Sequence, residues 1–138
     1  MEILISIPNE KEMALIRHYT TIFVLDAGDL QKQQFLIAKH KDKFIGFGRL
    51  RDHKECIELC TLGVMPAYRN KGVGKKIATE LMKKSDAKIY VVCIIPKFFE
   101  KLGFKTVINY PDSILRKHHM CTTKFMVNEP YCVMQLTE

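Results

Sequence analysis

Hydrophobic and polar positions alternate at the start of the chain and then change to a helical spacing. The run MEILISI, residues 1–7, predicts a first strand that ends at Pro8. Asn9 is followed three residues later by Glu12, and this spacing predicts a capping box at the start of a helix. Apolar residues then recur at helical spacing to about residue 25, so we expect a strand followed by a capped helix.

Residues 35–64 contain three apolar runs, separated by the short polar segments HKDK and RDHKE. This pattern predicts three successive antiparallel strands. From about residue 71 to residue 84 the apolar positions return to helical spacing and form one stripe. The helix predicted here therefore directly follows the third strand.

The last third of the chain is less regular. Residues 87–95, AKIYVVCII, predict a strand buried on both faces. Pro96 suits the first turn of a short helix, which we expect Gly103 to end in left-handed geometry while Phe104 packs back on that helix. Residues 105–129 favour no element, and YCVMQL predicts a final strand. The order of elements predicts one domain over residues 1–138, with a mixed, mostly antiparallel α/β (α+β) sheet flanked by helices.

Composition places the chain among globular proteins. It has 138 residues, of which 47% are hydrophobic and 27% are charged. No apolar run is long enough to span a bilayer, and the start does not resemble a signal peptide. We therefore expect a cytoplasmic protein that does not associate with membranes.

Charge favours an anionic ligand without choosing one. The chain has 22 Lys and Arg against 15 Asp and Glu, a formal charge of +7. No basic arm or RNA-binding motif is present, so a nucleic-acid partner is not expected. Five cysteines without a CxxC pair predict free thiols, and His118, His119, Cys121 and Cys132 match no zinc spacing, so we expect no metal.

The stretch RNKGVGKK, residues 69–76, lies between the third strand and the following helix. A glycine-containing turn that opens a helix presents backbone N–H groups to an anion. GVGKKI lacks the hydroxyl residue of a P-loop and the third small residue of the dinucleotide fingerprint. It satisfies the pattern Arg/Gln-x-x-Gly-x-Gly/Ala at every specified position, from Arg69 to Gly74.

The run LGVMPAYRNKGVGKKIATELM, followed by FFEKLGF, resembles the GNAT acyltransferase superfamily. The resemblance implies that acetyl-CoA is the acyl donor. It also implies that two central strands splay apart, and that a strand N–H near Val64 polarises the thioester carbonyl. Backbone groups of residues 62–64 would hold the pantetheine arm, and N–H groups of residues 70–75 would hold the pyrophosphate. The implied cofactor-binding residues are Leu62, Gly63, Val64, Arg69, Asn70, Lys71, Gly72, Val73, Gly74, Lys75 and Phe99.

Glu58 is the candidate catalytic base, because several family members carry a catalytic glutamate on this strand. An amine must lose its proton before it can attack a thioester. Glu58 lies in an apolar strand, where desolvation would raise its pKa. Two other roles stay open: a solvent-facing residue paired with Lys54 or Arg51, or an anchor for the substrate ammonium.

Phe99 departs from the family pattern. Many members have a tyrosine at this position, placed to protonate the leaving thiolate, and phenylalanine has no proton to give. Cys93 or a water could serve instead, or the thiolate could leave unprotonated. The sequence therefore names no general acid.

The acceptor is less well defined than the donor. FFEKLGF is similar to the acetyltransferase domain of bacterial N-acetylglutamate synthases, and the tail matches those domains loosely. A small amine such as a glutamate-like amino acid is the first expectation, with Arg49, Arg51, Arg116 and Lys117 as candidate cations for its carboxylates. The alternatives are a protein lysine or N-terminal acetyltransferase and a non-catalytic acetyl-CoA-binding regulator. Pairing of two copies through edge strands or the last strand is common in this fold, so a homodimer is one possibility.

Overall fold

The computed structural model describes residues 1–125 and 127–137. Its strands form a seven-stranded sheet with the hydrogen-bonded order β1-β2-β3-β4-β5-β7-β6. The strands are β1 (Leu4–Ser6), β2 (Phe35–His40), β3 (Lys43–Asp52), β4 (Ile57–Val64), β5 (Ile89–Cys93), β6 (Phe104–Thr106) and β7 (Cys132–Leu136). The helices are α1 (Glu10–Ile22), α2 (Val73–Met82), α3 (Pro96–Glu100) and α4 (Asp112–Lys124), with short 3-10 turns at Lys32–Gln34 and Pro66–Tyr68. The predicted mixed, mostly antiparallel α/β architecture is confirmed.

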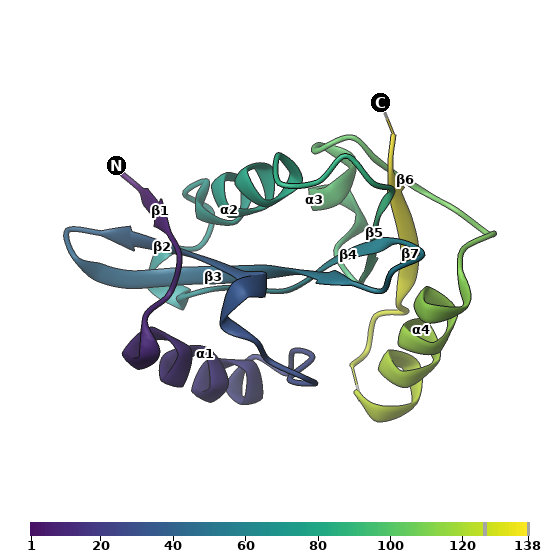
Figure 1. Ribbon diagram of the computed structural model, residues 1–138, viewed down its shortest axis with the longest axis horizontal. Helices are drawn as coiled ribbons and strands as arrows, with labels where there is room; N and C mark the ends of the chain where they lie inside the picture. Colours follow the sequence, from purple (N-terminus) through teal and green to yellow (C-terminus); the bar gives the residue numbers. More distant parts are fainter. Residues whose placement is uncertain (126, 138) are drawn as a thin grey trace. The chain divides into compact units, whose positions relative to one another are not determined.

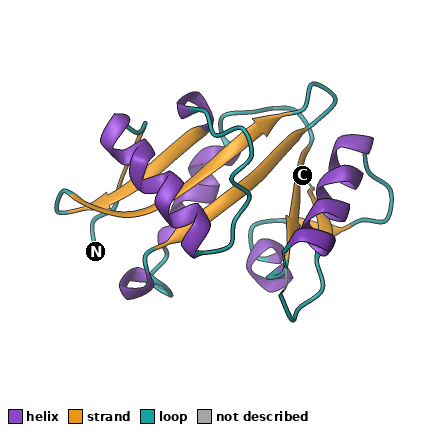
Figure 2. Ribbon diagram, turned by 90° about the horizontal axis from the view of Figure 1, so that it is seen from below, coloured by secondary structure: helices purple, strands orange, loops and turns teal. Residues whose placement is uncertain are grey.

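The chain forms two compact units, Met1–Leu50 with Leu59–Lys84, and Arg51–Glu58 with Ser85–Glu138. In the first unit, α1 and α2 lie on opposite faces of the strands (Figure 1). Figure 2, viewed from the α1 side, shows α1 lying across the long strands of this unit. Met13 and Ile16 of α1 pack with Phe35, Ile37 and Phe47 in a buried cluster.

The other face of the first unit is covered by α2, which lies very close to β3. A Cβ atom added at Gly46 would lie 2.9 Å from Cδ1 of Ile77, and one added at Gly48 would lie 3.1 Å from its Cγ2. Glycine at these two positions therefore lets the helix that follows the 69–76 turn approach the sheet. The predicted apolar stripe of α2 faces the core, since Val73, Ile77 and Leu81 are buried.

The second unit contains β5, β7 and β6 as antiparallel neighbours, and the start of β4 pairs in parallel with β5. Figure 1 shows α3 and α4 on opposite sides of these strands. Gly103 has φ +99°, and the rings of Phe99 and Phe104 meet edge to face with centroids 5.4 Å apart. The left-handed end of the short helix and the packing of Phe104 are thus confirmed.

The segment that favoured no element contains α4. Its first turn is stabilised from another part of the chain, because the Ser113 N–H donates to Oε1 of Glu55 at 3.0 Å. The α4 N-cap position, Pro111, makes no side-chain cap hydrogen bond. A helix whose first turn depends on a distant carboxylate leaves little local signal in the sequence.

None of the described helices is both long and apolar enough to cross a membrane.

The predicted capping box at α1 is present. The Glu12 N–H donates to Oδ1 of Asn9 at 2.9 Å, and the Asn9 N–H donates to Oε1 of Glu12 at 2.8 Å. We expect Asn9→Ala to lower the free energy of unfolding by about 1 kcal/mol, measured by urea denaturation, because one helix-end N–H loses its acceptor. Asn9→Ser, which retains an acceptor, should stay close to the wild type; equal losses in both variants would contradict the capping role.

Candidate functional site

The 69–76 turn joins the end of β4 to α2 within the first unit. Asn70 has φ +63° and Gly72 has φ +84°, so the chain enters the left-handed region twice before the helix begins. Gly72 is the N-cap residue of α2, and the first intrahelical bond of this region runs from the Lys76 N–H to the Gly72 carbonyl at 3.0 Å. In an α-helix the N–H groups of the first turn have no intrahelical acceptor. The turn therefore presents backbone donors and a helix N-terminus, which together suit an anion.

Gly72 is required here by its backbone conformation rather than by crowding. No atom lies within 4 Å of a Cβ built at this position, so the space above the turn is open. A residue with a side chain at position 72 would have to adopt the same positive φ, which costs an L-residue about 1–2 kcal/mol. Asparagine at position 70 is one of the few residues besides glycine that adopt this region readily, since a short amide side chain can hydrogen-bond locally.

Arg69 holds the turn against the end of β4. Its Nε donates to the Val64 carbonyl at 2.9 Å, and its guanidinium lies 5.0 Å from the centroid of the Phe23 ring. Lys71 is part of the turn, and its Nζ lies 5.9 Å from the centroid of the Tyr68 ring. Arg69 therefore has a structural role in this conformation, connecting the strand end to the helix entry.

Gly63, in the segment predicted to hold pantetheine, is fixed by packing. A Cβ atom there would lie 2.7 Å from Cζ of Phe47 and 3.0 Å from Cδ2 of Phe23. Leu62 and Val64 on either side are partly exposed. The backbone of β4 thus runs close to two aromatic rings just before the turn.

Glu58 lies at the start of β4 in the second unit and is completely buried. Its Oε1 lies 2.9 Å from Nε2 of His53, and its Oε2 is paired with Nζ of Lys117 on α4. Lys117 is itself 7% exposed. A buried carboxylate needs such partners, because an unpaired charge in the interior is strongly destabilising.

These partners reverse the predicted shift of the Glu58 pKa. Burial raises the pKa, but the hydrogen bond to His53 and the charge of Lys117 outweigh burial and hold it below the ordinary value. The prediction of a raised pKa was therefore wrong. The alternative of a solvent-facing Glu58 is also wrong, because its side chain is not exposed.

Two of the cations predicted for a dicarboxylic acceptor are occupied by the protein itself. Arg49 is completely buried and donates to Thr61 and Gln34 side chains, so it does not face a ligand. Lys117 is the buried partner of Glu58. Arg116, in contrast, is exposed on α4. Sequence reasoning missed His53 as a partner of Glu58, because a histidine in a polar turn carries no signal of burial.

Phe99 and Cys93 occupy the interior of the second unit. Phe99 is 5% exposed and packs against Phe98 and Phe104. Burial and the neighbouring Cys132 raise the pKa of Cys93 to about 12. A thiol that holds its proton this tightly is a poor acid for a leaving thiolate, so Cys93 is not a good general acid.

His118 is bonded within the protein, since its Nε2 lies 2.9 Å from the Tyr131 carbonyl oxygen. Across residues 1–125 and 127–137, no cluster of three metal-binding side chains is present.

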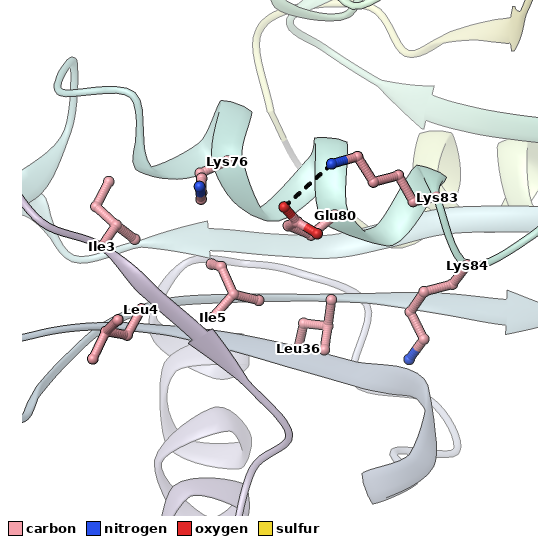
Figure 3. Close-up of a pocket in the computed structure, with 8 residues that line it drawn as sticks. All are labelled: Ile3, Leu4, Ile5, Leu36, Lys76, Glu80, Lys83 and Lys84. Atoms are coloured by element: carbon pink, nitrogen blue, oxygen red, sulfur yellow. Dashed lines mark ion pairs between the residues drawn. The ribbon is translucent and has the colours of Figure 1, made fainter.

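An open groove lies elsewhere in the first unit, between β1 and α2 (Figure 3). Its volume is about 490 Å³. The apolar side is formed by Ile3, Leu4, Ile5 and Leu36, and the charged side by Lys76, Glu80, Lys83 and Lys84. None of the residues that line the groove is predicted to bind the cofactor. We therefore place the candidate cofactor site at the 69–76 turn and not in this groove.

A protein-family model described as "Acetyltransferase (GNAT) domain" matches residues 31–106, which is more than half of the chain. The matched region contains β2 to β6, the glycine turn and Glu58. The chain therefore belongs to the GNAT acetyltransferase family, whose members are acyl-CoA N-acyltransferases.

Solved structures share the fold at low sequence identity. Rv2747 from Mycobacterium tuberculosis, in complex with CoA and NLQ, matches with a TM-score of 0.79 at 17% identity, over 98% of this chain and 99% of that one. N-acetylglutamate synthase from Neisseria gonorrhoeae, complexed with coenzyme A and N-acetyl-glutamate, matches with a TM-score of 0.75 at 13% identity over 99% of this chain. This chain spans 35% of that synthase. Arabidopsis thaliana Naa50, in complex with the bisubstrate analogue CoA-Ac-MVNAL, has a TM-score of 0.66 at 16% identity over all of both chains.

The lowered pKa of Glu58 predicts how Lys117→Met will respond to pH. At pH 7 the variant leaves a buried carboxylate without its lysine, and we expect a loss of about 3–5 kcal/mol in the free energy of unfolding. In the wild type, Glu58 stabilises the fold above its unfolded pKa of about 4.3, and this stabilisation is lost as the pH falls through the lower folded pKa. In the variant Glu58 should protonate more readily, so the difference between the two proteins should shrink in acid.

Denaturant unfolding between pH 4 and pH 7 measures this difference. Lys124→Met removes an exposed lysine from the same helix and should change stability by less than about 0.5 kcal/mol. A loss from Lys117→Met that is the same at both pH values would contradict the ion pair.

Proposed function

We propose that this protein transfers the acetyl group of acetyl-CoA directly to a primary amine of a small molecule. The observation that carries the proposal is the turn from Arg69 to Lys75, where two left-handed residues precede the N-terminus of α2, a geometry that suits an anion. Membership of the GNAT family supports the pyrophosphate of coenzyme A as that anion. The two neighbours crystallised with coenzyme A and an acetylated amino acid or NLQ support this assignment.

The donor would extend from this turn along the end of β4. Backbone groups of Leu62, Gly63 and Val64 would hold the pantetheine arm as an added strand, as the family resemblance implies. A strand N–H there would stabilise the negative charge that develops on the thioester oxygen during attack. The splayed strands expected for the thioester stay a prediction.

Transfer requires an uncharged nitrogen at the thioester carbon. The nitrogen lone pair forms the new C–N bond, the C–S bond breaks with its electron pair remaining on sulfur, and the nitrogen loses one proton. Because its pKa is lowered, Glu58 is ionised at neutral pH and is a weak proton acceptor. Its charge is already balanced by Lys117, so we assign the proton to water rather than to Glu58.

A small acceptor is favoured over a protein surface. Within the second unit, Lys117 of α4 pairs with Glu58 and helps to bury this carboxylate. An amino-acid acceptor agrees with the acetylated amino acid named for the Neisseria gonorrhoeae synthase, whereas Naa50 was crystallised with a peptide-like analogue.

A second candidate is a non-catalytic regulator that binds acetyl-CoA. Two observations favour it: Glu58 is fully occupied by His53 and Lys117, and Phe99 is buried and has no acidic proton. A thiol-release assay with acetyl-CoA and panels of amino acids, polyamines and peptides separates the candidates. Binding without turnover on every panel would select the regulator, turnover on peptides alone would select protein acetylation, and failure to bind acetyl-CoA would reject the proposal.

Gly72→Ala should weaken acetyl-CoA binding by tenfold or more, measured by titration calorimetry. The substitution either strains the left-handed conformation or moves the amides away from the pyrophosphate. Gly103→Ala is the matched control, because Gly103 also has positive φ but lies in the other unit. We expect the control to lose stability while keeping its affinity for acetyl-CoA; equal affinities in all three proteins would reject the turn as the binding site.

A further inference from the structure

Thr61 has an unusual backbone conformation inside a buried strand. It lies in β4, is 5% exposed, and has φ +52°. For a β-branched residue a positive φ is a true outlier. Such a conformation costs about 1–3 kcal/mol and persists only where surrounding contacts enforce it.

The contacts that enforce it centre on Arg49 of β3. Nε of Arg49 donates to Oγ1 of Thr61 at 2.8 Å, and Oγ1 donates in turn to the Asp26 carbonyl at 2.9 Å. Nη2 of Arg49 donates to the same carbonyl at 3.1 Å. Thr61 and Arg49 therefore share one acceptor in the loop after α1, and the threonine hydroxyl is held on both sides.

Arg49 is in turn held from its far end. Nη1 donates to Oε1 of Gln34 at 2.9 Å and to the Asp29 carbonyl at 3.2 Å, and the carboxylate of Asp26 lies 3.8 Å from Nη2. The guanidinium is completely buried. A buried arginine with this many fixed partners has little freedom to move, so it defines the position of Thr61 rather than following it.

The position of Thr61 in the chain gives this network a consequence. Thr61 immediately precedes Leu62–Val64, and a left-handed residue turns the following peptide groups away from the direction they take in a regular strand. We propose that Arg49 is a positioning residue, which acts through Thr61 to aim the backbone of Leu62–Val64 at the acyl donor. This inference rests on the proposed function, because it assumes that these backbone groups meet the thioester.

The proposal predicts a change in kcat without a matching change in cofactor affinity. Thr61→Val retains the shape and the branched Cβ but removes the hydroxyl, so the strand should relax towards regular geometry. We expect kcat for acetyl transfer to fall tenfold or more, because the N–H that stabilises the thioester oxygen moves. The dissociation constant for coenzyme A should change by a smaller factor than kcat, since the pyrophosphate turn takes its shape from its own left-handed residues, Asn70 and Gly72. Thr61→Ser should restore kcat.

If Thr61 only stabilised the fold, Thr61→Val would not lower kcat more than it weakens coenzyme A binding. Asn9→Ala provides a control with a loss of stability at a site remote from β4, and it should leave kcat within twofold of the wild type when assayed well below its unfolding temperature. Gln34→Leu loosens the far end of Arg49 from a partly exposed position, and should lower kcat threefold or more.

Steady-state kinetics, coenzyme A titration and thermal unfolding of these variants decide the question. A Thr61→Val enzyme with kcat within twofold of the wild type would overturn the inference. If Thr61→Val does not fold, Gln34→Leu decides, and a kcat within twofold of the wild type would then overturn it. A wild-type protein that releases no thiol with any acceptor would instead refute the proposed function, and this inference with it.

Discussion

The first unit depends on placing one guanidinium, that of Arg49, in its interior. A buried charge is tolerated when hydrogen bonds and a countercharge surround it. Here the acceptors come from the 26–34 loop and from Thr61, and the Asp26 carboxylate supplies the countercharge. Because the acceptors lie far apart in sequence, the loop, β3 and β4 must assemble together before the charge is satisfied. Removing one partner from such an arrangement typically costs about 3–5 kcal/mol.

The second unit also buries a charge, and here the charge is negative. Glu58 is buried, and it remains ionised because Lys117 and His53 compensate the loss of water. A buried carboxylate becomes a strong base only when nothing nearby stabilises its charge. In this protein the environment favours a permanent negative charge, and that distinction changes the chemistry that Glu58 can support.

The features that the sequence predicted correctly are those whose conformation depends on residues close together in the sequence. The Asn9–Glu12 capping box, the left-handed end of α3 at Gly103 and the glycine turn before α2 each lie within a few residues. The GNAT family follows from the same local pattern, since a phosphate-binding turn needs a particular backbone path within a single loop. The family model matches residues 31–106, which contain this turn and Gly103.

The amino-acid sequence by itself determined the family, the order of most elements and the turn proposed to bind the cofactor. Tertiary structure alone decided the start of α4, which Glu55 stabilises from elsewhere in the chain, and the low pKa of Glu58. It also decided that Arg49 is internal and that Thr61 takes a left-handed conformation. The physical reason is that local pattern reports backbone hydrogen bonding over a few residues, whereas burial and charge pairing depend on distant segments that meet only in the folded protein.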